Sequence, residues 1–400
     1  MLEGKAEFQT IALADTIQKG RKITYGIVQP GEFVDDGVIL VRGRDYSSGW
    51  RDLQGFVRVT AQVDAPYKRS KLKPGDLVLT IVGANTGNVA VVPEWLDGAN
   101  ITQTTARIAV DASVAVPGFI EQVLRSSIGQ KEVYRYLKGG AQPGLNLADV
   151  ERFNIPLPPV AEQRRIAEIL RTWDEAIEKL EALRAAKKRR LQVLREKLTF
   201  LDSEGEPVRL GDVTEEITAR NGTGRLGRDM VMGVTNSRGI VPMREQTIAN
   251  DIARYKLVPH KAFAYNPMRI NVGSIAMNES IESILVSPDY VVFACLEERL
   301  EPHFLDHLRK TKWWAHFINS GGSGSVRQRT YYADLAAMKT PLPSFERQTQ
   351  IADILNTARR DVDITAREIT ALRRQKRGLM QKLLTGEWRV NLEDVTEMSG

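Results

Sequence analysis

The most constraining feature of this chain is a fifteen-residue segment that occurs twice. Residues 156–170 read PLPPVAEQRRIAEIL, and residues 341–355, placed 185 positions later, read PLPSFERQTQIADIL. Proline lacks an amide donor and restricts the residue before it, so each segment favours an extended entry into a helix that cannot grow backward. The chain therefore contains an internal duplication, and we expect the two helices to begin near Ala161 and Glu346.

Both predicted helices carry the same apolar stripe in the same phase. Mostly apolar residues recur at a mean spacing of about 3.5 over about four and a half heptads, which is typical of a coiled-coil seam. Each helix of about 38 residues would be roughly 57 Å long at about 1.5 Å per residue. The seam residues are Ile166, Leu170, Trp173, Ile177, Leu180, Leu191, Leu194 and Leu198 in the first copy, and Ile351, Leu355, Val362, Ile369, Leu372, Leu379 and Leu383 in the second.

Neither helix can bury such a seam alone, so the two need each other or partner helices. An antiparallel pair would place Ile166 beside Leu383, and Arg184 beside Thr365, so that the polar seam positions meet near the middle. We favour this pairing because about 145 residues lie between the helices. That length leaves room for a globular domain that carries the chain back.

The regions outside the helices resemble each other as relatives. Residues 72–80 and 257–265 each predict a turn that leads into a strand, and residues 87–90 and 273–276 begin the following strand in each region. The fold class is therefore α+β, with two related globular domains joined by two long helices that pack as an antiparallel coiled coil with pseudo-two-fold symmetry. The expected ranges are 1–155 for the first domain, 156–200 for the first helix, 201–207 for a linker, 208–340 for the second domain, 341–386 for the second helix and 387–400 for a tail.

The bulk composition indicates an ordinary globular protein. Of the 400 residues, 42% are hydrophobic and 26% charged, and no apolar run approaches the roughly 18 residues that a membrane span requires. Cys295 is the only cysteine, and the first residues lack the order of a signal peptide, so we expect a cytoplasmic protein without membrane contact. The net charge of +6 is spread evenly along the chain, so any phosphate contacts must come from local patches.

Several short motifs carry a family resemblance. The motifs include two Pro-Leu-Pro segments, at 156–158 and 341–343, followed by Gln163 and Gln348 respectively. A third motif is Lys-Leu-Leu-Thr-Gly at 382–386. With these motifs the chain resembles the DNA-specificity subunit of a Type I restriction–modification system over nearly its whole length. Residues 73–77 (KPGDL) and 83–87 (GANTG) are similar to the family's strand and turn in the first domain, whereas Tyr-Asn-Pro at 265–267 departs from that pattern in the second.

The resemblance implies a role in DNA recognition without catalysis on this chain. In that family each of two target-recognition domains reads one half of an interrupted double-stranded DNA site, while the helices fix the domain separation and dock methyltransferase (M) subunits. The expected partners are therefore DNA, two M subunits and restriction/translocase (R) subunits. S-adenosylmethionine, ATP and Mg²⁺ would belong to those partners, and adenine would be the methyl acceptor.

Base reading requires bidentate groups on exposed loops, with Arg suited to guanine and Asn or Gln to adenine. In the first domain the candidates are Asn85, Thr86, Asn88, Thr102, Gln103 and Gln142, with Lys68, Arg69 and Lys71 for phosphates. In the second domain they are Asn236, Arg238, Arg269, Asn271, Arg327, Gln328 and Arg329. The alternative is that these loop amides cap turns and that the surface cations are merely solvated.

Two other function classes remain open from the sequence. A self-sufficient DNA methyltransferase or nuclease is disfavoured because Asn266-Pro267 begins an amino-methyltransferase motif but lacks its second proline and aromatic residue. Residues 222–227 match the spacing of a dinucleotide-binding loop but lack the following helix, and no histidine has the setting of a zinc site. The other class is a coiled-coil adaptor that never meets DNA.

Overall fold

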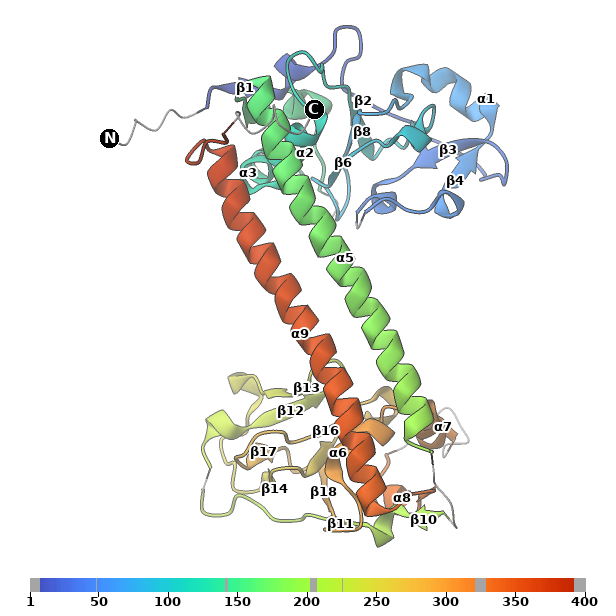
Figure 1. Cartoon of the computed structure of the whole chain (residues 1–400), viewed down its shortest axis with the longest axis vertical. Coiled ribbons are helices and arrows are strands. Elements are labelled where there is room, and N and C mark those ends of the chain that lie inside the picture. Colours follow the sequence, from blue (N-terminus) through green and yellow to red (C-terminus); the bar gives the residue numbers. More distant parts are fainter. Residues whose placement is uncertain are drawn as a thin grey trace. The chain divides into compact units, whose positions relative to one another are not determined.

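The chain forms two compact units, each assembled from segments far apart in the sequence. The computed structural model describes residues 8–47, 49–140, 143–201, 207–224, 226–320 and 329–391. The first unit comprises Met1–Leu180 with Glu368–Gly400, and the second comprises Glu181–Arg367. The two long helices therefore each contribute one half to each unit (Figure 1).

The first unit is built around a four-stranded antiparallel sheet with the order β2-β8-β5-β6. Smaller pairings join β4-β3-β7 and β1-β9. The bounds are β1 Thr10–Ala12, β2 Thr24–Tyr25, β3 Val38–Val41, β4 Val57–Val59, α1 Ala61–Asp64, β5 Leu77–Thr80, β6 Val89–Val91, β7 Asn100–Ile101, β8 Thr105–Ile108, α2 Pro117–Arg125, α3 Ser127–Tyr136, α4 Leu147–Glu151, β9 Asn154–Pro156 and α5 Val160–Leu198.

The second unit repeats this plan with a four-stranded sheet of order β11-β18-β15-β16. The pairing β10-β19 takes the place of β1-β9, while the hairpin β12-β13 and the antiparallel pair β14-β17 form two further two-stranded sheets. The bounds are β10 Val208–Arg209, β11 Thr214–Glu216, β12 Met232–Thr235, β13 Gly239–Pro242, β14 Lys256–Val258, β15 Phe263–Tyr265, β16 Ile275–Met277, β17 Ile284–Val286, β18 Val291–Cys295, α6 Pro302–Leu308, α7 Lys312–Ser320, α8 Tyr332–Ala336, β19 Lys339–Thr340 and α9 Phe345–Leu384.

The central strand of each sheet is buried on both faces. In β5, Leu77 and Leu79 point into the core shared with α2 and the long helices, while Val78 points into a separate core on the other face. In β15, Phe263 and Tyr265 face the helices and Ala264 faces the opposite core. Because side chains alternate along a strand, this pattern explains why both segments are continuous apolar runs.

The turn before each central strand is also repeated. Gly75 has φ +83° and its amide donates to the Val92 carbonyl at 2.9 Å. Lys261 has φ +63° at the corresponding place, and its amide donates to the Asn278 carbonyl at 2.9 Å. A residue other than glycine in this left-handed backbone conformation costs roughly 1–2 kcal/mol. The second turn therefore keeps the same geometry despite an unfavourable local free energy at Lys261.

The long helices pair antiparallel within each unit, as the fold prediction requires. In the first unit, Ile166 and Leu170 of α5 share a core with Met380 and Leu383 of α9 and with α2. In the second unit, Leu191 of α5 shares a core with the N-terminal half of α9 and with α6. The helices begin at Val160 and Phe345, one residue before the expected starts.

Every seam position named from the sequence is buried or half-buried. Trp173 is half-buried on α5, and Thr365 and Lys376 of α9 are buried although they are polar. Lys187 donates to Thr365 at 3.0 Å and pairs with Asp361 at 2.8 Å, so Thr365 contacts a residue about one turn beyond Arg184.

A buried glutamine fixes the start of α5 to the globular part of the first unit. Gln163 is completely buried, and its Oε1 accepts a hydrogen bond from the Val116 amide at 2.8 Å, where α2 begins. Its Nε2 donates to the carbonyls of Pro158 at 2.8 Å and Val114 at 3.3 Å. One side chain thus joins the proline entry, the helix and the loop before α2.

The second unit contains the same arrangement, with every partner 185 positions later. Gln348 is buried, and its Oε1 accepts from the Glu301 amide at 2.9 Å, where α6 begins. Its Nε2 donates to the carbonyls of Pro343 at 3.0 Å and Arg299 at 3.2 Å. The sequence repeat is therefore a repeat of specific hydrogen bonds as well as of the apolar seam.

Polar contacts between helices differ in the two units. In the first, Lys376 lies 2.6 Å from the Asp174 carboxylate and donates to Gln122 of α2 at 3.2 Å. The residue corresponding to Gln122 in the second unit is His307, which contacts Asn356 of α9 at 3.1 Å. Each unit thus combines a shared apolar plan with its own polar pairs.

Candidate nucleic-acid interface

A hollow of about 380 Å³ in the first unit gathers three of the candidate base-reading residues. Asn85, Thr102 and Gln103 line it together with Arg42 and Arg44. Asn85 lies on the loop between β5 and β6, the threonine and glutamine precede β8, and the two arginines follow β3. Three polar loops therefore converge at one edge of the sheet.

Only some of these groups are free to bind a ligand. Arg42 is held by Asp45 through bonds of 3.0 and 3.2 Å, and the Thr102 hydroxyl bonds to that of Thr104 at 2.9 Å. Arg44, Asn85 and Gln103 are exposed, and within the described part of the chain their side chains form no hydrogen bond. The arginines were missed from the sequence, although an Arg-Gly-Arg directly after an apolar strand was an available signal.

The remaining first-unit candidates lie outside this hollow. Lys68 and Arg69 are exposed on the short 3-10 helix Ala65–Ser70, whereas Lys71 pairs with Asp64 at 2.7 Å. The Thr86 hydroxyl donates to the Gly83 carbonyl at 2.7 Å and so stabilises its own turn. Asn88 is half-buried where β6 begins, and Gln142 lies outside the described residues.

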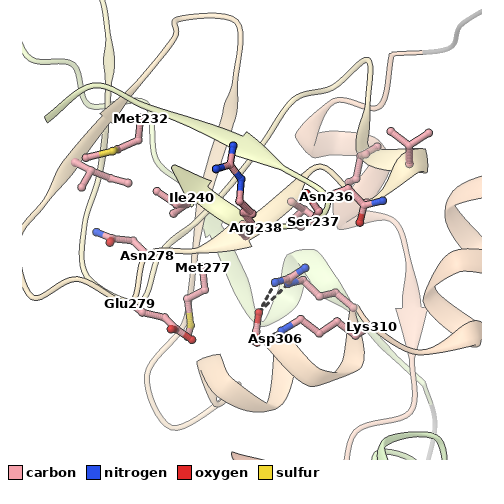
Figure 2. A pocket seen from close by; sticks show the side chains of 18 of the residues that line it. Met232, Asn236, Ser237, Arg238, Ile240, Met277, Asn278, Glu279, Asp306 and Lys310 are labelled. Carbon is pink, nitrogen blue, oxygen red and sulfur yellow. Dashed lines mark hydrogen bonds and ion pairs between the residues drawn. The ribbon is translucent and has the colours of Figure 1, made fainter. Parts of the chain in front are cut away.

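The second unit has a larger hollow, of about 1180 Å³, at the β12–β13 hairpin (Figure 2). Asn236 and Arg238 lie at the hairpin tip and line it, together with Asn271 of the loop between β15 and β16. Arg269 is exposed on that same loop but does not line the hollow.

A neighbouring hollow of about 500 Å³ contains Arg329. Its other lining residues include Lys256, Asn266 and Tyr290. Arg327 and Gln328 lie outside the described residues, so the structure places one of the three candidates at 327–329.

Most charges around the large hollow are already compensated. Asp306 of α6 (Figure 2) is paired with Arg309 and Lys310, each at 2.5 Å. Arg359 of α9 pairs with Glu279 at 2.5 Å. Burial opposes ionisation of Asp306, but the two cations outweigh it and lower the pKa of this carboxyl. Among the described lining cations, Arg238 is the one without an ion pair.

The described residues contain no group of three or more His, Cys, Asp and Glu side chains that could hold a metal ion. Burial raises the pKa of the Cys295 thiol and lowers that of His307 to about 3, so neither side chain is poised for proton transfer near neutral pH. Within the same part of the chain, no helix has the length and hydropathy of a membrane span.

Comparison with known proteins finds relatives among Type I restriction–modification proteins. Residues 16–187 match the family model of the Type I restriction modification DNA specificity domain. The specificity subunit of the Type I restriction enzyme EcoBI from Escherichia coli is 35% identical over 170 residues, which are 42% of this chain and 35% of that subunit. The chain thus aligns with about a third of that relative's length.

More distant relatives cover most of the chain. A putative Type I restriction enzyme MjaX specificity subunit from Methanocaldococcus jannaschii is 23% identical over 363 residues, 84% of this chain and 83% of the relative. The crystal structure of a Type I S subunit from M. genitalium has a TM-score of 0.59 at 14% identity, covering 96% of this chain and 98% of that one. A chain from a study of complex assembly in the Type I restriction–modification system has a TM-score of 0.56 at 18% identity, covering 97% and 100%.

Both solved structures share the fold of this chain, in which each of two α+β units includes one half of each long helix. Residues 16–187 thus match the DNA specificity domain of Type I systems, and the chain as a whole is similar to Type I specificity subunits, as the sequence motifs indicated.

Proposed function

We propose that this chain reads a bipartite, interrupted DNA site, with one target-recognition domain for each half-site. The observation that supports this most strongly is the duplication itself. Each unit presents a polar hollow at the loops of a sheet with the same strand order, and the hollows differ in their side chains. Two related but different recognition surfaces suit an asymmetric site.

The paired helices would set the gap between the two half-sites. Half-sites on one face of B-DNA have centres about 34 Å apart, or a multiple of that distance. Helices of 39 and 40 residues are long enough to set such a spacing, since the helical rise is about 1.5 Å per residue. Their exposed faces would also dock two M subunits.

The chemistry would then lie in the partners. Relatives of this chain are named as specificity subunits, so we assign no catalytic step to it and place S-adenosylmethionine, ATP and Mg²⁺ on the M and R subunits. Adenine would be the methyl acceptor, and the assembled complex would act in the cytoplasm. The even charge distribution leaves much of the phosphate neutralisation to the partner subunits.

Methylome sequencing of a strain that carries this chain with its M subunits tests the proposal. The expected result is a two-part methylated motif with a gap of fixed length. A contiguous motif would contradict the two-domain model, and the absence of any motif would favour an adaptor that does not bind DNA. Stoichiometric binding of S-adenosylmethionine by the isolated chain would favour a self-sufficient methyltransferase.

The role of the helices has its own test. Inserting one heptad into both α5 and α9 adds about 10 Å to each helix at about 1.5 Å per residue. We expect the gap in the methylated motif to lengthen while the bases of both halves stay the same. Changed bases with an unchanged gap would show that the helices do not measure the spacing.

A further inference from the structure

The loop between the third and fourth strands of each sheet carries an asparagine at the same place. Asn85 lies two residues before Gly87, which has φ +97° and precedes β6. Asn271 lies two residues before Gly273, which has φ +85° and precedes β16. Since β5-β6 and β15-β16 have the same register, Asn85 and Asn271 are structurally equivalent.

A second loop faces this one in both units. In the first, β3 runs parallel to β7 with Leu40 opposite Asn100, and the loop with Arg44 follows β3. In the second, Val231 pairs parallel with Leu285, 185 residues after Asn100, and the β12–β13 hairpin follows. The loop after β3 therefore corresponds to the hairpin tip that carries Arg238.

Both pairs of loops are in close contact. A Cβ built on Gly43 would lie 2.8 Å from Oγ1 of Thr80, at the end of β5. A Cβ built on Gly273 would lie 2.7 Å from Oδ1 of Asn236, at the hairpin tip. Real Cβ contacts are longer than this, so glycine allows the two loops to approach in each unit.

In each unit, one arginine and one asparagine that line the hollow have side chains free to bind a ligand. Arg44 and Asn85 line one hollow, and Arg238 and Asn271 line the other. All four side chains are exposed, and none forms a hydrogen bond or ion pair within the described ranges. In contrast, neighbouring cations such as Arg42 are held by carboxylates.

We infer that Arg44 with Asn85, and Arg238 with Asn271, are equivalent base-reading pairs, one for each half-site. The inference rests on the proposed function and deepens it. An exposed guanidinium can donate two bonds to N7 and O6 of guanine, and a free carboxamide can bond N7 and N6 of adenine. Each unit thus carries one guanine reader and one adenine reader on corresponding loops.

Lysine substitutions separate base reading from charge. Arg44→Lys and Arg238→Lys keep the positive charge but remove the planar fork that binds guanine bidentately. Each variant should be tested as the full chain assembled with its M subunits, against a randomised library of sites. Matched controls are Arg152→Lys in the first unit and Arg254→Lys in the second, because both arginines are exposed and lie outside the two hollows.

We expect each variant to relax one guanine in one half-site only, with a loss of discrimination of about 5- to 150-fold. Asn85→Ala and Asn271→Ala should relax an adenine in the same respective halves. Binding to non-specific DNA and its salt dependence should stay unchanged for the lysine variants, because the charge is retained. The control variants should keep the wild-type motif.

Three results would overturn the inference. The first is an unchanged motif for both lysine variants, and the second is relaxation of the same half-site by both. The third is a change of the second half-site by Arg329→Lys but not by Arg238→Lys, which would move reading to the neighbouring hollow. A wild-type complex without any sequence preference would instead refute the proposed function, so the two failures are distinguishable.

Discussion

The repeated glutamine at the start of each long helix should be a major source of stability in its own unit. Replacing Gln163 by alanine removes the acceptor of the Val116 amide and the donor to the Pro158 carbonyl. Gln163 is completely buried, so water reaches these groups poorly. A buried polar group that loses its partner costs about 1–3 kcal/mol. We therefore expect a loss of about 2–6 kcal/mol in the free energy of unfolding of the first unit.

The second unit provides a matched variant. Gln348→Ala removes the same set of bonds and should cost a similar amount, but in the other unit. Urea unfolding would measure the free energies, and hydrogen–deuterium exchange would locate the effect. Gln163→Ala should accelerate exchange in α2, and Gln348→Ala in α6. Methionine at either position keeps the side-chain length without the amide, so it separates lost bonds from lost volume.

An exposed glutamine on the same helix serves as the control. Gln350→Ala should change the free energy of unfolding by less than about 0.5 kcal/mol, because surface substitutions away from special features have small effects. A loss below about 0.5 kcal/mol for both buried glutamines would refute the reasoning, since it rests on unsatisfied buried groups. Equal acceleration of exchange in α2 and α6 by each variant would refute the assignment of each glutamine to one unit.

Three further outcomes follow from the polar contacts. Lys376→Ala should cost about 1–3 kcal/mol in urea unfolding because it leaves Asp174 without its cation, whereas Lys187→Ala, at a more exposed pair, should cost less than about 1 kcal/mol. Burial lowers the pKa of His307 to about 3, below its value in the unfolded chain, so the unfolded chain takes up the proton first as the pH falls. The free energy of unfolding should therefore fall as the pH drops below about 6.5, by up to about 1.4 kcal/mol per pH unit. The variant H307Q should remove this part of the pH dependence, as measured by thermal unfolding. Arg389→Ala should loosen the segment after α9, seen as faster limited proteolysis there, because it breaks bonds of 2.7 and 2.8 Å to the Glu162 carboxylate.

The helices and the duplication could be predicted from sequence because both depend on local, periodic signals. The apolar stripe of each helix fixes its buried face, and the proline entry fixes its start within one residue. The turn at Lys261 was harder to predict from the sequence, because a lysine there adopts the left-handed conformation that a glycine adopts at Gly75. The residue types do not show that the two turns are equivalent, whereas the backbone hydrogen bonds around them do.

The polar surface was predictable only in part. Loop composition named Asn85 and Asn271 as candidates, but whether a side chain is free to bind a ligand depends on neighbours distant in sequence. Lys71 illustrates this, since Asp64 and the Gly98 carbonyl occupy its ammonium group. Arg44 was not among the candidates named from the sequence, because the loop that it faces comes close to it only once the sheet has formed.

The discontinuous composition of the first unit has a consequence for synthesis in the cell. This unit needs the segment that begins at Glu368, which the ribosome makes after the whole of the second unit. At a translation rate of about 5–20 residues per second, roughly 10–40 s pass between synthesis of the first half of α5 and synthesis of the second half of α9, with which it packs. During that interval its apolar flank is open to chaperones or to the same flank of another nascent chain, so translation speed and ribosome spacing become determinants of correct assembly.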